Sequence, residues 1–244
     1  MLRLAVLLAW LAPAPLMAAE CETIAFDGAD FTACRVDMTS ETLRLWLRDD
    51  EGEILGSFGA VDRRLRENGE TLGVAMNGGM YHSDRAPVGL YIEDGEEEMR
   101  VVTSEGPGNF GLLPNGVLCL NDDRAAVIES RHYADTRPAC THATQSGPML
   151  VIEGELHPRL LPGSTSHYVR NGVGVADDGR TVWLAISDEP VNFHHFARLF
   201  QERLATPNAL FLDGNISRLY APEMNRNDFG WALGPILGTV RPAD

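Results

Sequence analysis

Lysine is absent from this chain of 244 residues, and all 20 of its Lys and Arg positions are arginine. Aspartate and glutamate together number 35, so the formal net charge at pH 7 is −15. Nucleic acids and anionic membrane surfaces are bound through clustered basic residues, and the sequence contains no basic stripe. The composition therefore argues against both kinds of partner.

Long apolar runs are also missing beyond the first ~20 residues, which have the features of a signal peptide. Arg3 supplies a positive start, residues 4–11 form an apolar core, and Met17-Ala18-Ala19 offers small residues for cleavage. The core is too short for a stable transmembrane helix, although an uncleaved anchor stays an alternative. We expect residues 1–19 to be a signal peptide and the mature chain to start near Ala19 or Glu20. We therefore expect a periplasmic or secreted protein that is not stably inserted in a membrane.

Cysteine is scarce, and no pair of cysteines has the Cys-x-x-Cys spacing of zinc clusters. An even number of cysteines in an exported chain indicates two disulfides, for which three pairings are possible. We favour pairing between sequence neighbours because it closes short loops. The expected bridges are Cys21–Cys34 and Cys119–Cys140.

Residues 20–244 are enough for one well-buried domain, and no internal repeat or linker divides them. A helix is predicted at 192–204 from apolar residues at helical spacing, with Asn192 as its N-cap, and a shorter one at 61–68. Many strands with few, non-alternating helices predict an α+β domain with a mixed or antiparallel sheet core. The acidic segment 93–98 is interpreted as a solvated turn. The predicted strands are 43–47, 72–76, 88–92, 110–113, 117–120, 149–152, 172–176, 182–186, 209–212 and 236–240.

Four segments join a probable strand to glycine and polar side chains. One of them, 211–218, ends an apolar run abruptly in Asp213, Gly214, Asn215, Ser217 and Arg218. Polar groups at the end of a buried strand are costly to desolvate without partners, and rigid strand ends often hold reactive groups. Four such segments in one domain predict a single polar pocket built from loops. The other three segments are 77–82, 144–150 and 170–175.

These segments resemble the phosphodiester glycosidase family over about residues 70–240. The resemblance rests on Asn77-Gly78-Gly79-Met80-Tyr81, Gln145-Ser146-Gly147-Pro148, Arg170 with Val173-Gly174-Val175, and Leu212-Asp213-Gly214 with Ser217. Residues 108–110, 186–193 and 215–220 resemble the bacterial secreted branch. Asn215 and Ile216 replace two glycines of the eukaryotic branch, and Asn171 replaces its threonine. The resemblance implies an exported hydrolase that cleaves a sugar-1-phosphodiester on the sugar side, acting on a glycan phosphate or an exopolysaccharide.

A phosphate monoester leaves as a stabilised anion, so this reaction needs less acid help than an ordinary glycosidase, which uses two carboxylates. Asp213 is the expected catalytic carboxylate, and Arg170 the expected phosphate clamp, since a guanidinium can hold two phosphate oxygens. Asn77 completes the expected catalytic set. No metal and no cofactor is expected. The expected substrate-binding residues are Gly78, Gly79, Tyr81, Gln145, Ser146, Gly147, Asn171, Gly214, Ser217, Arg218 and Glu189.

Other interpretations stay open for the same residues. Asn77 and Gln145 could satisfy only buried backbone groups, and Arg170 could pair with a surface acid. The pocket could bind an exopolysaccharide without cleaving it. A serine nucleophile is disfavoured, because Gln-Ser-Gly-Pro lacks the Gly-x-Ser-x-Gly elbow. A metal-dependent hydrolase would rest on Asp188, Glu189, His194 and His195.

Overall fold

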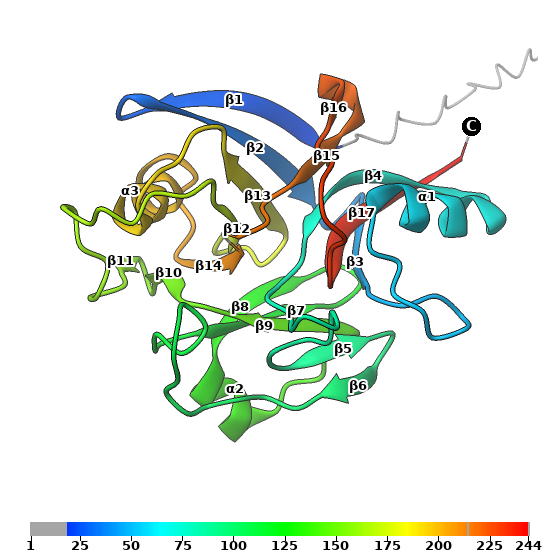
Figure 1. Ribbon diagram of the computed structural model, residues 1–244, viewed down its shortest axis with the longest axis horizontal. Coiled ribbons are helices and arrows are strands. Elements are labelled where there is room, and N and C mark those ends of the chain that lie inside the picture. The colour runs from blue at the N-terminus through cyan, green and yellow to red at the C-terminus, as the bar shows by residue number, and fades with distance from the viewer. Residues whose placement is uncertain (1–18, 214, 244) are drawn as a thin grey trace, which may run out of the picture.

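The chain folds into three antiparallel sheets (Figure 1). We describe residues 19–213 and 215–243 from a computed structural model. The first sheet has the strand order β1-β2-β13-β12-β14-β10-β11. The second has the order β16-β15-β4-β17-β3, and the third β6-β5-β9-β7-β8. The hydrogen-bonded pairs are antiparallel throughout the described residues, so the expected α+β class with an antiparallel core is confirmed.

The strands of the first sheet are β1 (Glu20–Phe26), β2 (Ala29–Asp37), β13 (Thr181–Ser187), β12 (Asn171–Val175), β14 (Asn208–Asp213), β10 (Met149–Ile152) and β11 (Glu155–Leu156). Those of the second are β16 (Arg226–Asn227), β15 (Leu219–Ala221), β4 (Glu70–Asn77), β17 (Ile236–Pro242) and β3 (Thr42–Trp46). Those of the third are β6 (Glu96–Met99), β5 (Tyr91–Glu93), β9 (His142–Ser146), β7 (Gly116–Leu120) and β8 (Ala125–Glu129). The helices are α1 (Phe58–Glu67), α2 (Ser130–Thr136) and α3 (Phe193–Arg198), with a π-helical turn at Leu199–Arg203 and a 3₁₀ turn at Pro222–Met224.

Both predicted helices are present, and side chains cap their first turns. The Ser57 hydroxyl accepts from the Ala60 N–H at the start of α1, three residues before the predicted start. The Asn192 side-chain oxygen Oδ1 accepts from the His195 N–H, as predicted for the N-cap of α3. These bonds satisfy backbone donors that have no partner inside the helix.

Two strand predictions and one turn prediction differ from the structure. The strand predicted at 110–113 is wrong, because this segment forms turns and bends. Gly111 packs so closely on Gly106 that a Cβ atom there would lie 2.0 Å from the Gly106 carbonyl oxygen. The strand predicted at 88–92 begins only at Tyr91. In the acidic segment the turn is confined to Asp94 and Gly95, and the glutamates that follow form the edge strand β6.

The hairpin of β1 and β2 was not predicted, yet it carries one of the two disulfides. Asp27 and Gly28 both have positive φ angles, 51° and 84°, as a two-residue hairpin turn requires. Cys21 and Cys34 lie opposite each other in this hairpin and are bonded. The second bridge joins Cys119 to Cys140, so the predicted pairing is confirmed.

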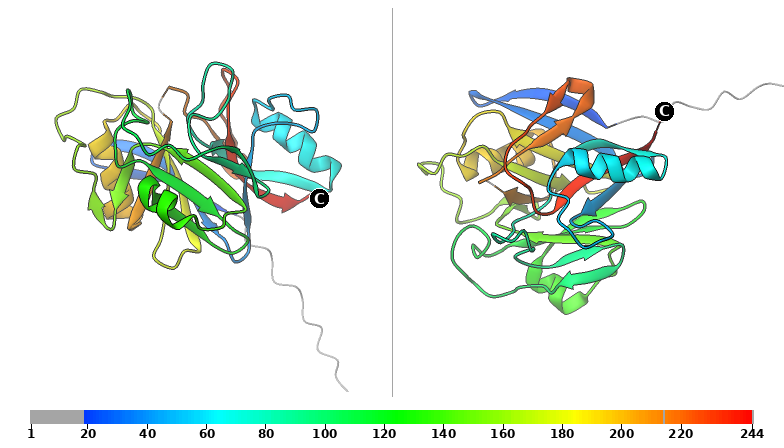
Figure 2. Two further views of the ribbon diagram at one scale, coloured as in Figure 1. Left: turned by 90° about the horizontal axis from the view of Figure 1, so that it is seen from below. Right: turned by 45° about the vertical axis from the view of Figure 1, so that its right-hand side comes forward.

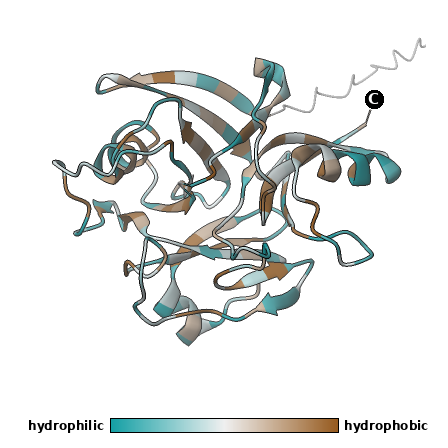
Figure 3. Cartoon of the chain, in the orientation of Figure 1, coloured by the Kyte–Doolittle hydropathy of each residue, from teal (hydrophilic) through white to brown (hydrophobic). Residues whose placement is uncertain are grey.

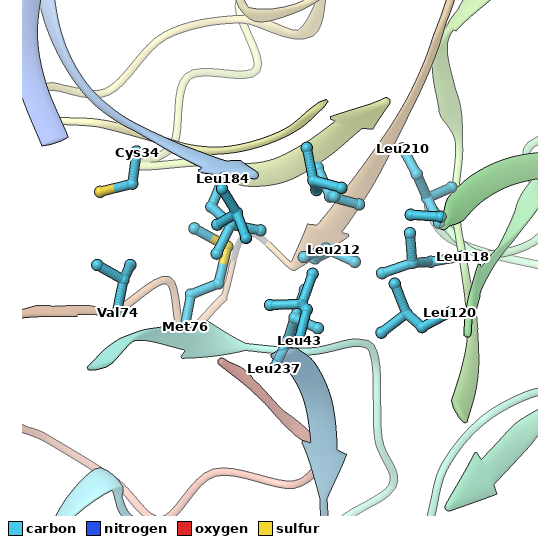
Figure 4. Packing of buried hydrophobic residues seen from close by; sticks show 14 of the residues in the cluster. Cys34, Leu43, Val74, Met76, Leu118, Leu120, Leu184, Leu210, Leu212 and Leu237 are labelled. Carbon is cyan, nitrogen blue, oxygen red and sulfur yellow. The ribbon is translucent and has the colours of Figure 1, made fainter. Parts of the chain in front are cut away.

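The main core lies where the three sheets meet (Figure 4). Leucines of β14 and β13, residues of β4, β3 and β17, and leucines of β7 point into it. A second cluster lies between the first sheet and α3, and a third lies under α1, which packs on β4 (Figure 2). The edge strand β6 consists mostly of hydrophilic residues (Figure 3). The polar groups described next lie at the ends of strands that contribute to this main core.

The expected signal peptide lies almost wholly outside the described residues, so its boundary at residue 19 stays a prediction. Within residues 19–213 and 215–243, no helix combines the length and apolar character needed to cross a membrane.

Candidate functional site

A pair of buried asparagines joins three strand ends. The Asn171 amide, at the start of β12, donates to the Asn77 carbonyl at the end of β4 at 3.0 Å. The Asn77 amide donates back to Asn171 Oδ1 at 3.2 Å, and the Asp213 N–H donates to the same oxygen at 3.1 Å. Asn77 Oδ1 accepts from the Arg218 N–H at 2.9 Å. The two amides thus fix the backbone on either side of the Asp213 loop.

A cleft of about 450 Å³ opens in front of this network. Asp213, 8 % exposed, is the only carboxylate among the described residues that line it. Asp213 Oδ1 accepts from the Asn215 N–H at 2.9 Å, which orients the carboxylate within its own loop. The described lining is Met80, Tyr81, His82, Ser83, Arg85, Val88, Gly108, Asn109, Asp213, Asn215 and Ile216.

One wall of the cleft is the loop 80–88, which follows β4. Backbone bonds from His82 N–H to the Ala86 carbonyl and from Val88 N–H to the Met80 carbonyl close it into a tight hairpin. Arg85 has a φ of 73° and, among the described lining residues, is the only arginine. Its guanidinium lies 5.1 Å from the centre of the Tyr81 ring. The loop therefore presents a cation to the cleft that carries Asp213.

The pKa of the Tyr81 hydroxyl depends on the charged groups in and around the cleft. Burial raises the pKa of its hydroxyl, the charge of Asp213 raises that pKa further, and Arg85 and Arg218 lower it. The hydroxyl is therefore protonated at neutral pH and can act as a hydrogen-bond donor. It now donates to the Ala232 carbonyl at 3.4 Å.

Arg170 does not line the cleft. Side chains alternate along a strand, so Arg170 and Asn171 project to opposite faces of the first sheet. The guanidinium is fully buried beneath α3, 3.6 Å from the centre of the Phe193 ring. It donates to the carbonyls of Val191 and Ser166, both at 2.8 Å. This placement differs from that of the expected phosphate clamp, and no surface acid pairs with it among the described residues.

The Arg170 surroundings also leave its charge poorly compensated. Burial lowers the pKa of the guanidinium to about 10. Nη1 is buried without a hydrogen-bond partner among the described residues. The side chain acts as a brace between the start of β12 and the segment before α3.

Gln145 and Ser146 serve the scaffold in this arrangement. Gln145 Oε1 accepts from the N–H groups of Leu90 and Val102, and its amide donates to the Val102 carbonyl at 2.6 Å. The Ser146 hydroxyl donates to the Leu212 carbonyl at 2.9 Å, just before Asp213. Both side chains are buried. They match the alternative in which buried amides satisfy backbone groups.

The three glycines predicted to admit an anion are needed for packing. The Gly78 N–H already donates to the Pro235 carbonyl at 2.7 Å. A Cβ at Gly79, whose φ is 157°, would lie 2.6 Å from the Thr144 hydroxyl. A Cβ at Gly147 would lie 2.7 Å from the Asn115 Cβ atom. A Cβ at Gly78 would lie 3.0 Å from the Leu237 nitrogen, so close packing within the protein accounts for glycine at all three positions.

Ser217 and Arg218 follow Asp213 in the chain but are not among the described residues that line the cleft. The Ser217 hydroxyl lies 2.8 Å from the Asp213 carbonyl oxygen and 3.0 Å from that of Val169. Arg218 donates from Nη2 to the Trp231 carbonyl at 2.7 Å, and burial lowers the pKa of its guanidinium. Gly214, also expected in the site, lies outside the described residues.

The acidic pair after β13 is engaged elsewhere. Asp188 forms an ion pair with Arg226 and accepts from the Thr32 hydroxyl. Glu189 accepts from the Asp30 N–H at 3.3 Å. Neither lines the cleft, and among the described residues no three or more His, Cys, Asp or Glu side chains gather closely enough to hold a metal ion.

Several residues of the cleft were not among the expected site residues. Arg85 and Asn109 come from loops outside the four predicted segments, whereas His82 ends the predicted segment 77–82. Arg85 lies only four residues after Tyr81, and this proximity to the motif is a signal that could have found it. The arrangement joins one oriented carboxylate to a cation and several neutral donors, a set suited to a sugar bound to a phosphate.

Known proteins match the chain in sequence and in fold. The phosphodiester glycosidase family model matches residues 70–236. The uncharacterized protein YigE of Escherichia coli (strain K12) is 33% identical over 228 residues, covering 93% of this chain and 87% of that protein.

Solved structures share the fold at low identity. The catalytic domain of zebrafish N-acetylglucosamine-1-phosphodiester alpha-N-acetylglucosaminidase, auto-inhibited by its pro-peptide, has a TM-score of 0.62 at 15% identity, covering 92% of this chain and 83% of that one. A protein from Burkholderia pseudomallei K96243 has a TM-score of 0.53 at 12% identity, covering 86% of this chain and 74% of that one. The family match spans well over half of the chain, and the chain belongs to the phosphodiester glycosidase family.

Proposed function

We propose that the chain is an exported hydrolase that cleaves a sugar-1-phosphodiester between the anomeric carbon and the phosphate oxygen. The observation that carries this proposal is the oriented carboxylate of Asp213 in a cleft that also holds Arg85. Water attacks the anomeric carbon, the bond from that carbon to the phosphate oxygen breaks, and the products are a free sugar and a phosphate monoester. One carboxylate suffices because the leaving group is already an anion.

Asp213 acts as the catalytic residue in this proposal. A carboxylate can accept the proton of the attacking water or stabilise positive charge that develops on the sugar. Its contact with the Asn215 N–H and the anchoring of its backbone by Asn171 hold it in one orientation. Preorganisation of this kind lowers the cost of stabilising a transition state.

Arg85 takes the phosphate-binding role that the sequence had suggested for Arg170. A guanidinium can hold two phosphate oxygens, and the charge of Arg85 faces the cleft from the loop 80–88. Asn109 and Asn215 supply amides for sugar hydroxyls on the same lining. We favour a glycan phosphate of the cell envelope or of an exopolysaccharide as substrate, with two disulfides supporting a periplasmic or secreted location.

Hydrolysis in water enriched in heavy oxygen tests the reaction. A panel of sugar-1-phosphodiesters is incubated with the exported protein, and mass spectrometry locates the label. Label on the anomeric hydroxyl supports attack at the sugar. Label on the phosphate contradicts it and favours a phosphodiesterase, whose metal dependence a chelator then tests. Binding of the panel without turnover would favour a glycan-binding protein.

A further inference from the structure

The first described residue, Ala19, is packed into the fold. It is 1 % exposed and belongs to the main core cluster, together with residues of β2, β3 and β17. Its backbone N–H donates to Glu41 Oε1 at 2.8 Å. A residue directly preceding the first strand is thus held by both its methyl group and its nitrogen.

Glu41 is an unusual partner, because it is a carboxylate that is only 7 % exposed. It follows the tight turn after β2, where the Glu41 N–H donates to the Asp37 carbonyl at 2.9 Å. Burial raises the pKa of Glu41, while the nearby Arg241 lowers it and Glu223 raises it. Arg241 is itself paired with Glu223 at 2.7 Å. A buried carboxylate that faces a neutral amide is costly unless a cation compensates it.

We propose that a signal peptidase hydrolyses the Ala18–Ala19 bond and that the new α-ammonium of Ala19 forms a buried ion pair with Glu41. The step consumes one water, leaves a carboxylate on Ala18 and converts the Ala19 amide nitrogen into an ammonium. The nitrogen already lies within hydrogen-bond distance of Glu41, so the pair forms without moving the backbone. This inference rests on the proposed export of the chain and is independent of the proposed glycosidase activity.

The same contacts choose between the two start positions that the sequence leaves open. Cleavage after Ala19 would remove a methyl group from the core and leave Glu41 without its backbone donor. Cleavage before Ala19 keeps both. The Cys21–Cys34 bridge lies two residues further on and already restrains the new terminus. Little additional chain entropy is therefore lost when the ammonium is held in place.

Mass spectrometry of the exported mature protein tests the cleavage site. The expected first residue is Ala19. A mature protein that begins at Glu20, or at any other residue, would overturn the proposal.

A double comparison tests the ion pair. Four proteins are compared. Two begin at Ala19 and two carry one extra glycine before Ala19, and within each pair one protein keeps Glu41 and the other carries Glu41→Gln. Glutamine still accepts from an amide N–H but leaves an ammonium unpaired. The melting temperature should fall with Glu41→Gln by about 4 °C more in the Ala19-first form than in the extended form. Equal changes in both forms would rule out the pair.

A chemical probe covers the case in which a variant unfolds. Acetylation of the native Ala19-first protein at pH 7 should modify the α-amino group at least tenfold more slowly than in urea-unfolded protein. An equally fast reaction in the two states would contradict a buried ammonium.

Discussion

Arg85 and Arg170 both lie next to glycine-containing segments of the family motif, yet their surroundings differ. Arg85 lies on a hairpin loop at the rim of the cleft, over the Tyr81 ring. Arg170 lies on the α3 side, by which we mean the face of the first sheet that α3 covers, and donates to two backbone carbonyls.

This difference shows how one residue type serves two purposes. On the cleft side, the polar groups face a space that a substrate can enter. On the α3 side, they brace backbone segments against one another. Substitutions on the cleft side should therefore change kinetics at nearly constant stability, and those on the α3 side should do the reverse. The predictions below test that separation.

The largest effect is expected from Asp213→Asn on the cleft side. The substitution keeps the shape and removes the charge, so the rate should fall by roughly 10²-fold or more, the scale of a lost acid–base group. Turnover of a sugar-1-phosphodiester and the melting temperature are compared for parent and variant, with chelator present. Asp177→Asn, in the exposed turn after β12, is the matched control and should behave like the parent. Full turnover by the Asp213 variant would remove Asp213 from the mechanism.

On the α3 side, Arg170→Ala should cost stability and spare catalysis. The change removes the guanidinium donor of the Val191 and Ser166 carbonyls, of which Val191 keeps its bond from the Tyr168 N–H, and it opens a cavity beside Phe193. We expect a loss of about 2–4 kcal/mol in unfolding free energy, or roughly 4–16 °C in melting temperature, at unchanged kcat/KM.

Arg203→Ala is the matched control, because Arg203 is exposed in the π-helical turn of the same side. A parental melting temperature for the Arg170 variant, combined with a raised KM, would return Arg170 to the substrate site.

Arg85→Gln should give a smaller, purely kinetic effect. The neutral amide loses the charge and the two-point geometry, so we expect kcat/KM for the phosphodiester to fall by about tenfold. Arg85→Lys keeps the charge and should lose less. The melting temperature should stay within about 1 °C of the parent, because surface substitutions of this kind change stability little. Equal kinetics for parent and the Gln variant would show that phosphate is held elsewhere.

The predicted fold class is confirmed, whereas the roles of the motif residues stay predictions that the experiments above test. Apolar runs such as 72–76 and 209–212 became strands because their burial on both faces leaves few alternatives. The hairpin of β1 and β2 escaped prediction, since β1 mixes polar and apolar residues on an edge. Asp213 lies in the cleft, whereas Asn77 and Gln145 are turned inward.

The face of the sheet to which a motif residue points depends on the strand register, and a single sequence does not determine that register. Asn171 pairs with Asp213 on β14 and faces Asn77, so its neighbour Arg170 must face α3. Arg85 reaches the cleft because its loop folds back over β4's end, a long-range arrangement that local pattern does not encode.

The smallest effect concerns the pH dependence of stability, and it comes from a buried histidine outside the cleft. His157, next to β11, is buried, its Nδ1 accepts from the Arg159 N–H, and its Nε2 has no partner among the described residues. Burial lowers the pKa of this imidazole below its usual value of 6.5. Below pH 6.5 the unfolded chain therefore binds more protons than the folded chain does. The contribution of His157 to the free energy of unfolding is complete above pH 6.5 and is lost as the pH falls.

His157→Asn keeps an acceptor for the Arg159 N–H and cannot titrate. The fall in melting temperature between pH 7 and pH 5 should be smaller in this variant than in the parent by about 2–4 °C, which corresponds to roughly 1 kcal/mol. His132→Asn, on the exposed side of α2, is the control and should keep the parental slope. Thermal unfolding followed by circular dichroism at both pH values provides the measurement. Kinetics of the His157 variant at pH 7 should match the parent, because the residue lies outside the cleft. An unchanged pH slope together with altered kinetics would contradict the separation, since a buried residue outside the cleft would then act on catalysis and not on stability.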